Sequence, residues 1–112
     1  MTYVESVSLP TETFDRINKL LALPYFDEMT DDEMRNAEAK DGACEGIFGV
    51  TFKDGTSFTY DLCSGSSNYY DNMVFYDKEG YESVFDCDYE LDRKIKFDIG
   101  ENSYVINIDL VN

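Results

Sequence analysis

The chain from residue 47 onward consists of short segments in which apolar and polar residues alternate, separated by turn residues. Residues 94–99, for example, read Lys-Ile-Lys-Phe-Asp-Ile. Because side chains two positions apart lie on the same face of a strand, this pattern predicts a strand with one buried face. The Asp-Gly pair at 54–55 is typical of a hairpin turn. Successive hairpins predict an antiparallel meander of five or six strands.

Two helices and one short strand are expected before this region. Residues 2–8 alternate, which predicts the strand. Pro10 begins a helix over about 11–22, and a capping box, a threonine followed three residues later by a glutamate, begins a second helix over about 30–40. The expected fold class is α+β: two N-terminal helices, then the meander, with the first helix packed on the sheet in a single domain, 1–112. The apolar residues of the first helix, at helical spacing, are Phe14, Ile17, Leu20 and Leu21.

Net charge gives the strongest functional indication. The chain has 24 acidic and 9 basic residues and no histidine, so its formal charge is −15 on 112 residues. Leu, Ile, Val and Phe make up about a quarter of the chain. Highly charged chains tend to stay unfolded when this fraction is below roughly 20 %, so a folded protein is expected. A folded body of this charge repels nucleic acid and membranes and attracts cationic partners. We therefore expect a monomeric protein that binds a basic protein, and neither nucleic acid nor membrane.

One candidate binding segment is rich in acidic residues near the expected second helix. Helix capping explains the acids at 31–33, because negative charge is favoured in the first turn of a helix. Capping does not explain the acids at 27 and 28, so the segment is also a candidate patch for a basic partner. The candidate residues are Asp27, Glu28, Asp31, Asp32 and Glu33.

A second candidate is the run Asp86, Asp88, Glu90 and Asp92, in which acids recur at every second residue. In a strand, the four carboxylates would share one face at spacings of roughly 6.8 Å. That spacing is of the same order as the path between phosphates along a nucleic-acid strand. A charged edge strand that resists aggregation is the alternative. An EF-hand is excluded because a leucine stands where that loop needs glycine, although a weak irregular cation site stays open.

The third candidate is the adjacent pair Tyr69 and Tyr70, which is expected to lie in a polar loop. Tyrosine is a frequent anchor of protein interfaces because its ring is apolar and its tip is polar. The alternative is one ring packed on the sheet and the other exposed.

Catalysis has little support in this sequence. Histidine is absent, and the glycines form no phosphate-binding loop. We expect no enzyme activity, cofactor or metal site. The three cysteines, Cys44, Cys63 and Cys87, are widely spaced and odd in number, which favours unpaired, buried thiols in a reducing cytoplasm. Residues 1–9 lack the basic start and apolar run of a secretory signal, so a cytoplasmic location is expected.

In charge, length and lack of catalytic motifs, the chain resembles the small acidic inhibitors of phages and mobile elements, such as anti-CRISPR and anti-restriction proteins. It is also similar to immunity proteins that neutralise nuclease toxins. The resemblance implies a nucleic-acid mimic whose carboxylates stand in for phosphates in the basic groove of a nuclease or other nucleic-acid-binding protein. The alternative is an acidic protein-interaction or structural domain without mimicry.

Overall fold

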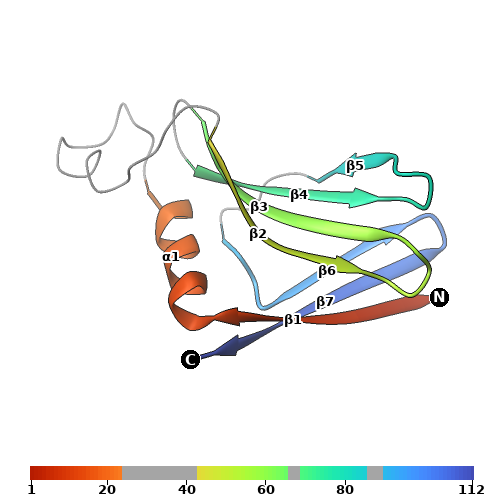
Figure 1. The fold of residues 1–112 in the computed structure, drawn as a ribbon, viewed down its shortest axis with the longest axis horizontal. Coiled ribbons are helices and arrows are strands. Elements are labelled where there is room, and N and C mark those ends of the chain that lie inside the picture. Colours follow the sequence, from red (N-terminus) through yellow and green to blue (C-terminus); the bar gives the residue numbers. More distant parts are fainter. Residues whose placement is uncertain (24–42, 66–68, 86–89) are drawn as a thin grey trace.

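The computed structural model describes residues 1–23, 43–65, 69–85 and 90–112. In these residues the chain forms one helix and seven strands, which build two sheets that face each other (Figure 1). The elements are β1 (Thr2–Pro10), α1 (Thr11–Leu21), β2 (Cys44–Thr51), β3 (Ser57–Ser64), β4 (Tyr69–Tyr76), β5 (Glu82–Val84), β6 (Lys94–Ile99) and β7 (Asn102–Val111).

The two sheets differ in size and in strand direction. The first has three strands in the order β1-β7-β6, and the second has four in the order β2-β3-β4-β5. The second sheet is antiparallel throughout, as the hairpin turns predicted. In the first sheet, β6 and β7 are antiparallel, but β1 runs parallel to β7, from Thr2 opposite Ser103 to Pro10 opposite Val111.

The expected fold class is therefore wrong. The described residues contain one helix and seven strands in two sheets, in place of two helices and a single meander of five or six strands. After β5 the chain leaves the second sheet, and β6 pairs with β7 in the first. The pairing of β1 with β7 also joins the two ends of the described chain. The second helix expected over about 30–40 lies outside the described residues.

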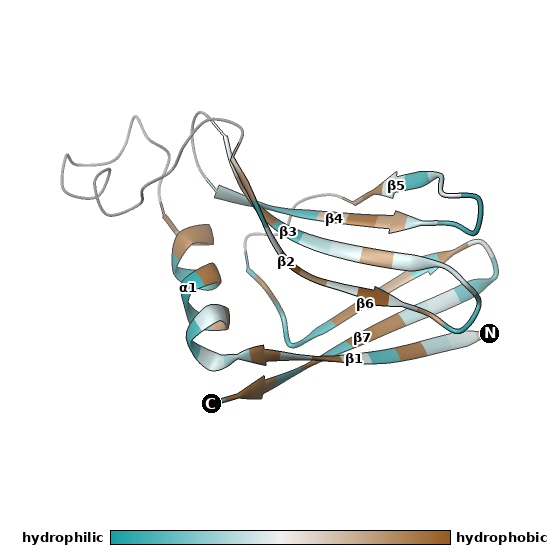
Figure 2. Cartoon of the chain, in the orientation of Figure 1, coloured by the Kyte–Doolittle hydropathy of each residue, from teal (hydrophilic) through white to brown (hydrophobic). Residues whose placement is uncertain are grey.

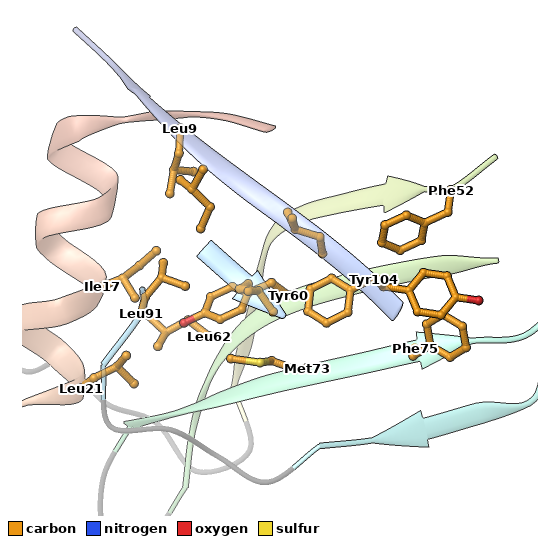
Figure 3. Packing of buried hydrophobic residues seen from close by; sticks show 14 residues of the cluster. Leu9, Ile17, Leu21, Phe52, Tyr60, Leu62, Met73, Phe75, Leu91 and Tyr104 are labelled. Atoms are coloured by element: carbon orange, nitrogen blue, oxygen red, sulfur yellow. The ribbon is translucent and has the colours of Figure 1, made fainter. Parts of the chain in front are cut away.

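The core lies between the two sheets and is largely aromatic. Hydropathy alternates along several strands, as the coloured cartoon shows (Figure 2), so that apolar side chains from both sheets meet (Figure 3). The Phe97 ring on β6 lies 5.5 Å from the rings of Phe58 and Phe75 and 5.3 Å from that of Tyr104. Such ring pairs each add about 0.5–1.5 kcal/mol beyond burial. Phe97 thus connects the second sheet to the first.

Helix α1 closes one end of the space between the sheets (Figure 1). It contacts β1 and β7 in the first sheet and β4 in the second, and its Ile17 and Leu21 are buried. The helix spans the predicted residues, but it does not cover the face of a single sheet as expected. No helix in the described part of the chain is long and apolar enough to cross a membrane.

At the other end, Asp54 connects the hairpin between β2 and β3 to the first sheet. Its carboxylate accepts hydrogen bonds from the backbone N–H of Thr56 at 3.0 Å, the hydroxyl of Thr56 at 2.6 Å and the hydroxyl of Tyr104 at 2.6 Å. Burial raises the pKa of Asp54, but the hydrogen bonds from Thr56 and Tyr104 outweigh it, so the pKa lies below its usual 3.8. Burial and the bond to Asp54 raise the pKa of Tyr104.

Cys44 and Cys63 are opposite each other on β2 and β3 and form a disulfide. The expectation of unpaired thiols is wrong for these two residues. The sequence separation of 19 gave no sign of the pairing, because the residues are brought together by the hairpin register. Cys87 lies outside the described residues.

Candidate functional site

The segment 90–92, between β5 and β6, is fixed to helix α1 by the side chain of Asn18. The Asn18 amide donates to the carbonyl oxygen of Leu91 at 3.3 Å, and its oxygen accepts from the Leu91 backbone N–H at 2.7 Å. The Leu91 side chain is buried in the core, with 1 % exposed. Glu90 and Asp92, on either side of it, are exposed. The backbone between these two solvent-facing side chains is therefore anchored to α1.

These carboxylates have no cationic partner within the described part of the chain. The ion pair found there joins Arg16 of α1 to Glu45 of β2 at 2.7 Å. Arg93, although adjacent in sequence, donates through Nε to the carbonyl oxygen of Ile108. Exposed charges of this kind attract an opposite charge within a Debye length of about 8–10 Å at moderate salt. Within the described residues, no ion pair neutralises Glu90 or Asp92.

A cavity of about 400 Å³ lies beside these two acids. Its apolar lining comes from both sheets, and its charged lining comes from the start of β6 and the residues before it. The lining therefore combines aromatic and aliphatic side chains with two acids and two lysines, which is the composition of a site for an amphipathic group. The lining residues are Phe58, Met73, Phe85, Glu90, Asp92, Lys94, Ile95, Lys96 and Phe97.

The structure places part of the second sequence candidate. Glu90 and Asp92 lie close together, but both are outside β5 and β6, so they do not meet the condition of four acids on one strand face. Exposed and buried side chains still alternate here although the segment is not a strand, because Leu91 is buried between the exposed Glu90 and Asp92. Asp86 and Asp88 lie outside the described residues.

The first sequence candidate falls wholly in the part of the chain that is not described. This applies to Asp27, Glu28, Asp31, Asp32 and Glu33. Their role as a binding patch stays a prediction.

The tyrosine pair begins strand β4 and does not lie in a loop as expected. Tyr69 lies opposite Ser64 and Tyr70 opposite Cys63, and both tyrosines are half-buried. Tyr69 packs against the core. Because successive residues of a strand face opposite sides, the Tyr70 ring lies on the outer face. One ring of the pair therefore packs on the core, as the alternative to an interface anchor expects for one of the two rings. An anchoring role for Tyr70 stays a prediction.

Sequence reasoning missed three residues. Tyr81 and Val84, at and beside β5, are 73 % and 67 % exposed, although both are large and apolar. Neither residue was a candidate from the sequence, because their exposure depends on β5 lying at the edge of the sheet. Asn18 resembled a solvent-facing residue of the helix, and its contact with Leu91 joins residues 73 positions apart.

The lining side chains of the cavity offer charged and apolar contacts to a bound group. Within the described residues, no group of three or more His, Cys, Asp or Glu side chains comes together in a way that could hold a metal ion. No protein-family model, curated protein or solved structure matches this chain.

Proposed function

We propose that this chain is a small acidic inhibitor that binds the basic groove of a nuclease or other nucleic-acid-binding protein, with carboxylates in place of phosphates. The observation that carries the proposal is the anchoring of Glu90 and Asp92. Both are exposed, both lack a cationic partner within the described residues, and both adjoin Leu91, whose backbone is held by Asn18. A mimic needs charges at fixed positions, because ordering mobile charges on binding reduces affinity.

The surrounding charge supports the same proposal. A net charge of −15 steers basic partners towards the chain and repels competing nucleic acid. Charge alone, however, would attract any basic protein. The fixed pair is what would distinguish a specific groove from general attraction, so the test must separate local from global charge.

The experiment compares two double variants with the same total charge. Glu90→Lys with Asp92→Lys changes the anchored pair, and Glu101→Lys with Asp109→Lys changes two exposed acids elsewhere. The protein and both variants are immobilised and exposed to cell extract at low salt, and bound proteins are eluted first with duplex DNA and then with salt. The proposal expects a nucleic-acid-binding protein that DNA releases, and its loss only in the variant at 90 and 92.

Two outcomes would contradict the proposal. Equal loss in both double variants would mean that global charge alone attracts the partner. Release by salt but never by DNA would mean that the partner's nucleic-acid groove is not the surface bound. Far-UV circular dichroism of both variants controls for folding.

A protein-interaction domain without mimicry is the second candidate. The exposure of Tyr81 and Val84 favours it, because large apolar side chains at an edge are typical of protein interfaces. In that case Tyr81→Ala should abolish partner binding while the charge variants leave it intact. The same pull-down, with this variant added, decides between the two.

A cytoplasmic site of action is part of the first proposal. Cytoplasmic thiols are kept reduced, so the protein must bind its partner with Cys44 and Cys63 unpaired. Repeating the pull-down with dithiothreitol tests this point directly. Loss of binding on reduction would favour an oxidising compartment.

A further inference from the structure

Among the described residues, strand β5 is the last strand of the four-stranded sheet and has one unpaired edge. The backbone N–H of Asp77 donates to the carbonyl oxygen of Tyr81 at 3.0 Å, and the N–H of Phe85 donates to that of Met73 at 3.1 Å. Residues 81, 83 and 85 therefore bond to β4, in agreement with the register of Ser83 opposite Phe75. Because hydrogen-bonding direction alternates along an antiparallel strand, the N–H and C=O groups of residues 82 and 84 point away from the sheet.

The same alternation fixes the side chains of this edge. Glu82 and Val84 lie on the outer face of the sheet, and Ser83 and Phe85 lie on the face towards the core. The Phe85 ring packs 4.9 Å from the Phe97 ring of the other sheet. Phe85 also lines the cavity of about 400 Å³. A strand added to β5 and running past Val84 would therefore bring its inward side chains to this cavity.

Charge distinguishes β5 from the facing edge strand, β6. The Ile108 N–H donates to the carbonyl oxygen of Arg93, and hydrogen-bonding direction then alternates along β6. The backbone groups of Lys94 and Lys96 therefore point away from β7, towards the outside of the sheet. Lysines along an edge oppose the addition of another strand, and of a basic strand above all. The outer face of β5 carries Glu82 and no base. A basic segment is thus favoured at β5 and disfavoured at β6.

We infer that the free edge of β5 and the adjoining cavity bind an extended, basic segment of a partner protein by strand addition. The backbone groups of Glu82 and Val84 supply the pairing, a basic side chain lies beside Glu82, and aliphatic side chains enter the cavity. Peptides bind to sheet edges in this way through main-chain bonds, with specificity from alternate side chains. The inference rests on the proposed function in one respect, that the partner is basic.

The probe is a fluorescein-labelled peptide of eight residues in which lysine and valine alternate. A peptide of alternating lysine and proline has the same charge but lacks half of the N–H donors and resists strand pairing, and a peptide of alternating glutamate and valine reverses the charge. Fluorescence anisotropy at moderate salt measures the affinity of each. The lysine–valine peptide should bind at least about tenfold more tightly than either of the others, a difference that matches the loss of one or two net hydrogen bonds.

A matched pair of variants tests the backbone contact. Val84→Pro removes an N–H that points away from β4, so the native sheet keeps its bonds, as edge positions allow. Val84→Thr keeps the N–H and the branched shape. The proline variant should bind the lysine–valine peptide about tenfold more weakly, and the threonine variant should bind within about threefold of the parent. Thermal melts establish that both variants are folded.

The parent protein supplies a second measurement that no folding defect can affect. Addition of the lysine–valine peptide should protect the amide protons of Glu82 and Val84 from exchange with solvent, as seen by ¹H–¹⁵N NMR. Protection confined to other elements would overturn the inference. So would equal binding of the lysine–valine and lysine–proline peptides, or undiminished binding to Val84→Pro.

Failure here is distinguishable from failure of the proposed function. The pull-down with DNA elution and the double charge variant at 90 and 92 test mimicry. Binding of the lysine–valine peptide to Val84→Pro tests strand addition. A partner that DNA never releases, together with normal peptide binding at the edge, would refute mimicry alone. A partner that DNA releases, together with no effect of Val84→Pro on peptide binding, would refute the edge site alone.

Discussion

Replacing Asn18 by alanine should destabilise the fold well beyond the effect of a surface mutation. The change removes both hydrogen bonds to Leu91, at 2.7 and 3.3 Å. Each is worth about 1 kcal/mol net, and a buried N–H left without a partner costs more. Alanine regains roughly 0.5 kcal/mol through its higher helix propensity. The free energy of unfolding should therefore fall by about 1.5 kcal/mol in balance, which lowers Tm by about 6 °C for a chain of this size.

Urea unfolding followed by far-UV circular dichroism measures this loss. Lys19→Ala, one position along the same helix and exposed, is the control and should change stability by less than about 0.5 kcal/mol. Asn18→Asp keeps the acceptor for the Leu91 N–H but loses the donor, so it should fall between the two. If Asn18→Ala unfolds at the same urea concentration as Lys19→Ala, the contact with Leu91 does not hold segment 90–92, and the argument for positioned carboxylates fails with it.

Three further predictions concern contacts elsewhere in the fold. Asp54→Asn should remove stability that depends on pH, because the pKa of Asp54 is lowered in the folded state. The parent should be more stable than the variant by the full amount above the usual pKa of 3.8, and this difference should disappear as the pH falls through the lower folded-state pKa. Urea unfolding between pH 3 and 7 measures the difference. Asp54 is ionised at neutral pH and accepts a hydrogen bond from Tyr104, so the loss of stability should already be measurable there. Reduction of the Cys44–Cys63 disulfide should lower the free energy of unfolding by about 3 kcal/mol, measured with and without dithiothreitol. Arg16→Ala should change it by less than about 1 kcal/mol, since both partners of that ion pair are about half exposed.

Local structure followed from the sequence more closely than topology did. The helix expected over 11–22 is observed at Thr11–Leu21, and the strand at 94–99 has the expected limits. Both depend on periodicity within a short window, where one face must be apolar. Capping and turn residues act over the same range, which is why the Asp-Gly hairpin at 54–55 was also recognised.

Pairing between distant strands could not be read in the same way. Any two strands with one apolar face satisfy the same pattern, so the alternation in residues 2–8 carries no information about β7 as its neighbour. The meander assumed that each strand pairs with the next along the chain. That assumption is correct from β2 to β5 and wrong between β5 and β6, where the chain crosses to the other sheet.

The candidate site was predicted only in its acidic half. Glu90 and Asp92 were identified from charge spacing, and both are exposed beside a cavity. The cavity itself depends on Phe58, Phe85 and Phe97, which come from both sheets. Since the division into two sheets was not predicted, neither was an opening between them.

The parallel pairing of β1 with β7 sets a time scale for folding during synthesis. The paired residues lie about one hundred positions apart, and ribosomes add about 5–20 residues per second. Strand β1 therefore waits for about 5–20 s before β7 emerges, and the three-stranded sheet cannot form earlier. In β1, Thr2, Ser6 and Ser8 alternate with the core-facing residues, which include the apolar Tyr3, Val7 and Leu9. They keep an unpaired strand soluble over that interval, before any sheet exists to protect it.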